Sequence, residues 1–168
     1  MDVAALLLEL FGRIPPLARA AVEGLDAATL TTSIAPGANT IGWLVWHAAR
    51  VQDDHMADIM EVDQVWAAGD WSGRFGLPAG TLEIGWGHTA EQMAAVHPEG
   101  PEAVIEYLDA VDTRTRGFLE SLTPADLDRI VDRRWDPPVT MGVRLVSIAD
   151  DSLQHVGQAA YVRGILGP

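Results

Sequence analysis

The chain contains no cysteine, no lysine and no long apolar run. Without cysteine it forms no disulfide and offers no thiolate nucleophile, so any metal site must use histidine, carboxylate or backbone ligands. Thiol chemistry would therefore need a thiol brought by a substrate. No stretch approaches the roughly 18 apolar residues of a membrane-spanning helix, so we expect no membrane partner.

Basic side chains are scarce and are all arginine. The eleven arginines face 24 acidic residues, which gives a net charge of −13. A chain this acidic repels nucleic-acid phosphates and anionic lipids. Arg133 and Arg134 are the only adjacent basic pair, so no basic cluster offsets the charge. We therefore expect no nucleic-acid partner.

The 168 residues, 48% of them apolar, suit one globular domain over residues 1–168. The first residues, MDVAALLLELFG, carry an acid where a signal peptide would be basic. They are predicted to be a helix of the mature protein, and the expected location is the cytoplasm.

Apolar residues recur at three- and four-residue steps in four segments of about 20 residues. These segments are predicted to be helices over residues 2–24, 40–60, 101–121 and 142–165. Pro15–Pro16 should kink or split the first helix, and Asn39 is a suitable N-cap for the second. No strand-like alternation lies between the segments. The sequence thus predicts an all-α, four-helix bundle with a long crossover between its second and third helices.

The connecting segments have different characters. Residues 25–38 are predicted to be a loop. Residues 61–98 are rich in glycine and tryptophan and predict a packed lid or crossover, with one short helix over 89–96. A short helical turn is predicted from Thr123, and residues 129–140 are predicted to be extended because they contain Pro137–Pro138.

Coordinating side chains occur on two of the predicted helices. His47 lies in the apolar stripe of the second helix, and Asp151 and His155 lie four residues apart on one face of the fourth. A buried carboxylate or imidazole needs a partner. A metal ion held by all three residues would provide one, since two imidazoles and a carboxylate form the ligand set of catalytic zinc and of several iron and nickel sites.

Other interpretations remain open from spacing alone. A single histidine on a helix stripe is typical of a hydrogen-bonded core residue, and an aspartate and a histidine four residues apart are typical of a helix surface pair. A direct hydrogen bond from Asp151 to His47 or His155 would also serve without a metal. His88 and His97 are expected to be exposed loop residues.

Two longer stretches resemble the DinB-like superfamily, a family of damage-inducible, metal-binding four-helix proteins. They are NTIGWLVWHAARVQDDHMADIM, residues 39–60, and SIADDSLQHVGQAAYVRG, residues 147–164. The resemblance covers nearly the whole chain. It implies that His47 and His155 are metal ligands and that Asp151 stands where the family usually has a third histidine. A carboxylate is still a competent ligand.

The resemblance also implies an activity. Some members are thiol S-transferases that use mycothiol or bacillithiol, and a wider relative is the mycothiol-dependent maleylpyruvate isomerase. The composition suggests an actinobacterial source, which favours mycothiol. We therefore expect a detoxifying transferase in which zinc, or else nickel, iron or manganese, activates the thiol for attack on an electrophilic small molecule.

The sequence also offers two candidate contacts for the thiol and two alternative classes of function. Asp54 and Gln158 lie toward the same helix faces and are candidate contacts for the thiol, although ordinary helix-face polarity also accounts for either. The alternatives are a non-catalytic, metal- or small-ligand-binding stress-response protein and, after it, a metal-dependent hydrolase. Exposed apolar edges of such bundles favour a homodimer.

Overall fold

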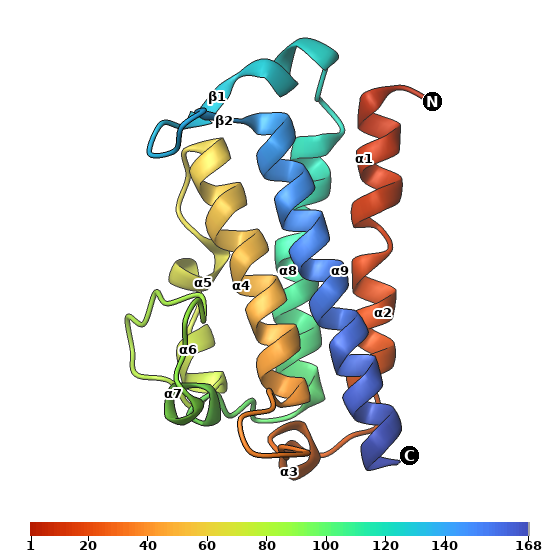
Figure 1. Cartoon of the computed structure of the whole chain (residues 1–168), viewed down its shortest axis with the longest axis vertical. Coiled ribbons are helices and arrows are strands. Elements are labelled where there is room, and N and C mark those ends of the chain that lie inside the picture. The colour runs from red at the N-terminus through yellow and green to blue at the C-terminus, as the bar shows by residue number, and fades with distance from the viewer. Residues whose placement is uncertain (168) are drawn as a thin grey trace.

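The computed structural model describes residues 1–167 and is predominantly helical, which confirms the predicted all-α class (Figure 1). The helices that form the bundle are α1 (Val3–Phe11), α2 (Ile14–Val22), α4 (Ile41–Met60), α8 (Pro101–Leu119) and α9 (Met141–Leu166). Within residues 1–167, no helix has both the length and the apolar character needed to cross a membrane.

The bundle has four arms, because α1 and α2 follow each other along one side (Figure 1). Helix α4 packs against α8 and α9, and α2 packs against the same two helices. Each arm contributes a large side chain that is fully buried: Phe11, Trp46, Tyr107 and Met141. Removing such apolar surface from water is the main force that holds the arms together.

Side-chain caps fix where the arms begin. Asp2, Thr40 and Thr140 each accept a hydrogen bond from the backbone N–H three residues further on. These bonds satisfy amides that the first helical turn leaves without partners. The N-cap of α4 is therefore Thr40, one residue after the expected Asn39.

The first arm breaks at Gly12 and Arg13, not at the prolines. Pro15 and Pro16 lie in the first turn of α2, where a missing N–H group costs no helical hydrogen bond. The predicted loop after this arm contains a short helix, α3 (Ala27–Leu30), whose N-cap is Asp26.

Residues 61–100 connect the upper end of α4 to the lower end of α8, so both helices run upward in Figure 1. This connection contains α5 (Val65–Ala68), α6 (Trp71–Arg74) and α7 (Ala90–Ala94). The last of these confirms the short helix predicted near residue 90. Trp66 and Phe75 are buried in the main core, so the connection is ordered by its own side chains.

A short hairpin precedes the last arm. A 3-10 turn, η1 (Pro124–Asp128), leads into β1 (Ile130–Asp132), which pairs antiparallel with β2 (Val139–Thr140). The predicted helical turn and extended segment are thus both present. Because β2 runs directly into α9, Asp132 lies beside the first turns of that helix and accepts a hydrogen bond of 2.7 Å from Arg144.

Candidate metal centre

His47 is held inside the bundle by aromatic and backbone contacts. Its ring is buried on α4 and stacks on Trp43, with ring centroids 4.6 Å apart and planes 8° from parallel. The Nδ1 atom of His47 faces the carbonyl oxygen of Ile84 at hydrogen-bonding distance. A carbonyl only accepts, so Nδ1 carries the proton and Nε2 keeps a free lone pair.

The segment that supplies the Ile84 carbonyl is tied to α4 by a buried arginine. Arg50 is fully buried and donates to the carbonyls of Leu82 at 2.9 Å and Glu83 at 3.3 Å. Gly85, which follows Ile84, has a φ of +91°, and a Cβ there would lie 2.8 Å from the His47 Nδ1 atom. Only glycine combines this backbone conformation with so close an approach to the ring.

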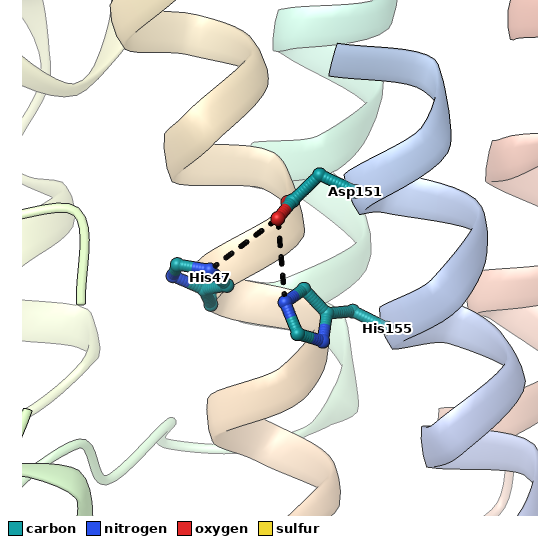
Figure 2. Close-up of side chains that lie close together, drawn as sticks. All are labelled: His47, Asp151 and His155. Carbon is teal, nitrogen blue, oxygen red and sulfur yellow. Dashed lines mark ion pairs between the residues drawn. The ribbon is translucent and has the colours of Figure 1, made fainter. Parts of the chain in front are cut away.

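Asp151 and His155 face His47 from α9 (Figure 2). The His155 Nε2 atom lies 3.5 Å from Oδ1 of Asp151, and the His47 Nε2 atom lies 3.9 Å from the same oxygen. All three potential ligand atoms lie within 4.8 Å of one another. The structure therefore brings together the three side chains that the sequence proposed as ligands.

The second nitrogen of each imidazole also has an acceptor. His155 Nδ1 lies 2.9 Å from Oε1 of Gln158, just as His47 Nδ1 faces Ile84. Metal-binding histidines usually donate their other N–H group in this way, which fixes the ring tautomer and orientation. Both Nε2 atoms consequently face Oδ1 of Asp151.

The spacing of these atoms favours a shared cation over direct hydrogen bonds. Tetrahedral zinc with bonds of about 2.0–2.2 Å separates its ligand atoms by about 3.3–3.6 Å. The separation of 3.5 Å from His155 to Asp151 matches this range, the separation of 3.9 Å from His47 to Asp151 lies slightly above it, and both exceed a good hydrogen bond. Moreover, Oδ2 of Asp151 is buried and has no hydrogen-bond partner among the described residues.

The electrostatics of the two histidines differ. Burial lowers the pKa of His47, which favours the neutral form that can bind a metal. The interaction with Asp151 raises the pKa of His155, so a proton and a metal ion would compete for its Nε2 atom. The site thus has one imidazole that is readily neutral and one whose proton a cation would displace.

The two remaining predicted site residues lie in different places. Gln158 contacts the site through its hydrogen bond with His155. Asp54 instead accepts a hydrogen bond of 2.7 Å from Gln64 and lines an open, acidic hollow of about 800 Å³ near the end of α4. The structure does not bring Asp54 into the group formed by His47, Asp151 and His155.

One loop histidine is not exposed as predicted. The side chain of His88 is only 8% exposed, because its ring packs against Trp46 at 5.9 Å and accepts a hydrogen bond from Trp43. His88 ends a turn that is closed by a hydrogen bond from its backbone N–H to the carbonyl of Gly85. His97 is exposed, as expected.

Sequence reasoning missed the pocket that adjoins the centre. This pocket, of about 540 Å³, is lined at one end by Asp151 and elsewhere by charged and aromatic side chains. We call it the arginine pocket and define it by Val51, His55, Ile84, Trp86, Asp132, Arg134, Trp135, Arg144, Ser147 and Asp151. The spacing of Arg144 and Asp151, seven residues apart on one helix, could have indicated part of it.

Similarity to known proteins supports the assignment of the family. A family model described as the DinB superfamily matches residues 10–159. The chain belongs to the DinB superfamily. The match includes both stretches that suggested the resemblance up to residue 159, and the superfamily's metal-binding character agrees with the cluster of two histidines and an aspartate.

A solved structure of similar fold extends this result. It is described as a conserved protein from Enterococcus faecalis, and it is 32% identical to the chain with a TM-score of 0.87. The similarity covers 96% of the chain and 95% of the Enterococcus protein. No protein with curated annotation matches the chain significantly. The comparisons therefore identify the family and the fold but name no activity.

Proposed function

We propose that this DinB-superfamily protein is a metal-dependent thiol S-transferase. The observation that supports it is the convergence of three ligand atoms within 4.8 Å, next to a pocket large enough for a small molecule. His47, Asp151 and His155 would hold one divalent ion, with zinc as the first candidate and nickel, iron and manganese after it. Such an ion would supply the acidity that deprotonates a coordinating thiol at neutral pH.

The chain's own residues provide orientation and shielding. Ile84 and Gln158 hold the two imidazoles through their Nδ1 atoms, and Trp43 covers one face of the His47 ring. Two imidazoles and one carboxylate leave the remaining coordination positions for a substrate atom. The absence of cysteine from the sequence agrees with a nucleophile that comes from a cosubstrate.

The proposed reaction joins the cosubstrate sulfur to an electrophilic carbon. The thiol loses its proton to solvent, its sulfur forms the new carbon–sulfur bond, and the leaving group departs with the bonding electron pair. Mycothiol is the first thiol to test and bacillithiol the second. Asp54 and Gln158 stay proposed contacts of the thiol, and the hydrogen bond from His155 makes Gln158 the stronger of the two.

Metal content and thiol-dependent turnover test the proposal. We expect purified protein to contain close to one divalent ion per chain and to accelerate the reaction of mycothiol with a bimane electrophile. His47→Ala should lose both properties, whereas His97→Ala, which removes an exposed histidine away from the three proposed ligands, should keep them.

Other results would replace the proposal. Saturable thiol binding without acceleration would identify a metal- or ligand-binding protein instead of an enzyme. Turnover of an ester or amide without any thiol would identify a hydrolase. Full metal occupancy in both Asp151→Ala and His155→Ala would show that the three ligands are wrongly assigned.

A further inference from the structure

The arginine pocket places two arginine side chains close together on an otherwise acidic protein. Two of the eleven arginines, Arg134 and Arg144, line it. Both contact Asp132, whose Oδ1 accepts from the backbone N–H and Nε of Arg134, and whose Oδ2 accepts from one terminal nitrogen of each arginine. The carboxylate is thereby fully used, and the two guanidinium groups with Asp132 carry a net charge of about +1.

The other charged groups around the pocket are acidic on balance, so binding of an anion would depend on the N–H donors of the two arginines and not on net charge. Burial, followed by the nearby Arg144, lowers the pKa of His55, so this histidine is neutral at physiological pH. Asp54 and Asp58 act on Arg134 from a neighbouring hollow that also contains Arg133. Asp151 faces the two histidines of the candidate metal centre.

The pocket also has exposed aromatic walls. Trp86 is 85% exposed and Trp135 is 65% exposed, so neither ring packs in the core. Large aromatic faces beside a pocket of ligand size are typical of sites that bind flat molecules. Ser147, on the same side of α9 as Arg144, adds a hydroxyl group to the lining of the pocket.

The geometry of α9 sets the length of molecule that fits. Arg144 and Asp151 are seven residues apart, which corresponds to about 10.5 Å along a helix at about 1.5 Å per residue. A carboxylate bound to Arg144 would leave space for about one or two fused rings, or a chain of similar length, before the candidate metal centre. Arg144 is well placed as an anchor, because its side chain is only 14% exposed and is fixed by Asp132 and His55.

We propose that the arginine pocket binds a small, flat organic acid, with its carboxylate on Arg144 and Arg134 and its far end at the metal centre. The acid is the electrophilic acceptor of the transfer reaction, and this role in turnover rests on the proposed function. The binding itself does not. Arg144 is then a specificity-determining residue, since it would favour acceptors with a carboxylate over neutral molecules of the same shape.

Calorimetric titration of the zinc-loaded full chain tests the binding without any thiol. The probes are naphthoate and naphthamide, which have the same rings but differ in charge. We expect wild-type protein to bind naphthoate at least tenfold more tightly than naphthamide. Equal affinity for the two probes would overturn the proposal.

Three variants locate the carboxylate. Arg144→Gln should reduce the preference for naphthoate to less than about threefold. Arg134→Gln, at a position 80% exposed, should reduce it partially in a protein that still folds with somewhat lower stability. Arg19→Gln, which removes a surface arginine paired with Asp109, should preserve the full preference. If Arg144→Gln does not fold, Arg134→Gln decides the result: an unchanged preference there overturns the proposal. If the preference for naphthoate survives both arginine substitutions and disappears when zinc is removed, the carboxylate binds the metal. This result also overturns the proposal.

Competition with thiols separates the acceptor from the cosubstrate as the source of the carboxylate. Bacillithiol carries carboxylates and mycothiol does not. If neither thiol displaces naphthoate, the acceptor assignment holds, whereas displacement by bacillithiol alone overturns it. Failure of the proposed function is a different result: selective naphthoate binding without thiol-dependent turnover contradicts the transferase and leaves the organic-acid site intact.

Discussion

Arg50 allows a direct test of whether the connection between α4 and α8 organises the candidate metal centre. Its guanidinium donates to the carbonyls of Leu82 and Glu83 and to Oδ2 of Asp53, all within 3.3 Å. The Ile84 carbonyl that holds His47 follows directly in the chain. Replacing Arg50 with methionine keeps most of the side-chain volume but removes every one of these donors.

Two separate losses are expected from Arg50→Met. Removing one partner of a buried ion pair costs about 3–5 kcal/mol, because the remaining charge is left without its partner. Asp53 would keep three weaker donors, which are the hydroxyl of Tyr107 and the amides of Val65 and Trp66. For a domain of this size, that cost corresponds to a fall of about 6–20 °C in Tm. Zinc affinity should fall about 10–100-fold, as is typical when a group that orients a metal ligand is disturbed.

Tyr107→Phe is the matched control. It removes the hydrogen bond that the hydroxyl donates to Asp53 and the one that it accepts from Arg50, but it leaves the bonds from Arg50 to the Leu82 and Glu83 carbonyls in place. We expect it to cost about 1–2 kcal/mol and to leave zinc affinity unchanged. Urea unfolding followed by circular dichroism measures the stability, and competition with a zinc-binding dye measures the affinity. Wild-type zinc affinity in folded Arg50→Met, or an equal loss in Tyr107→Phe, would refute the reasoning.

Three further predictions concern the loop, the hairpin and the core. Gly85→Ala should lower zinc affinity at least tenfold, because the new Cβ would lie 2.8 Å from Nδ1 of His47. Gly87→Ala is the control: this glycine also has a positive φ, but no described atom lies within 4 Å of the added Cβ, so only stability should fall. Competition with a zinc-binding dye, measured for both variants, distinguishes the two effects. The hydrogen bonds from Arg134, together with the charge of Arg144, hold the pKa of Asp132 well below its usual range. The ionised carboxylate therefore contributes fully to stability above about pH 4, the ordinary pKa of an aspartate. This contribution is lost only as the pH falls through the lowered pKa. The difference in free energy of unfolding between Asp132→Asn and wild type, measured with urea, should therefore be the same at pH 7 and at pH 5. A difference that is already smaller at pH 5 would contradict this assignment. Phe11→Ala should cost about 3–5 kcal/mol in urea unfolding and leave zinc affinity unchanged, since Phe11 is fully buried away from the three ligands.

The bundle helices were predictable because each one shows its amphipathic character within its own sequence. Apolar spacing located α4, α8 and α9 to within one or two residues of their observed ends. The break at Gly12 and the helix at Ala27–Leu30 were less accessible, since they depend on packing at the end of the first arm and on a cap at Asp26. Local signals there favoured Pro15–Pro16 and a loop.

The ligand set was predictable for a similar reason, and the surrounding groups were not. Asp151 and His155 show their relation through helical spacing, and His47 stands out as a polar residue in an apolar stripe. The Ile84 carbonyl reaches His47 across 37 residues of chain, a contact that no local pattern contains. The inward position of His88 depends in the same way on how the connection folds back over α4.

Helix α9 carries the core and the site on separate stripes. Its buried residues include Leu145, Ile148, Ser152, Val156 and Ala159, whereas the site residues occupy positions that each precede one of these by one: Arg144, Ser147, Asp151, His155 and Gln158. A step of one residue turns the side chain by about 100°, so one helix serves both packing and chemistry. Helix α4 has no such separation, because sixteen of its residues, His47 included, are buried. Substitutions at Asp151 or His155 should therefore affect metal binding more than stability, and substitutions at His47 should affect both.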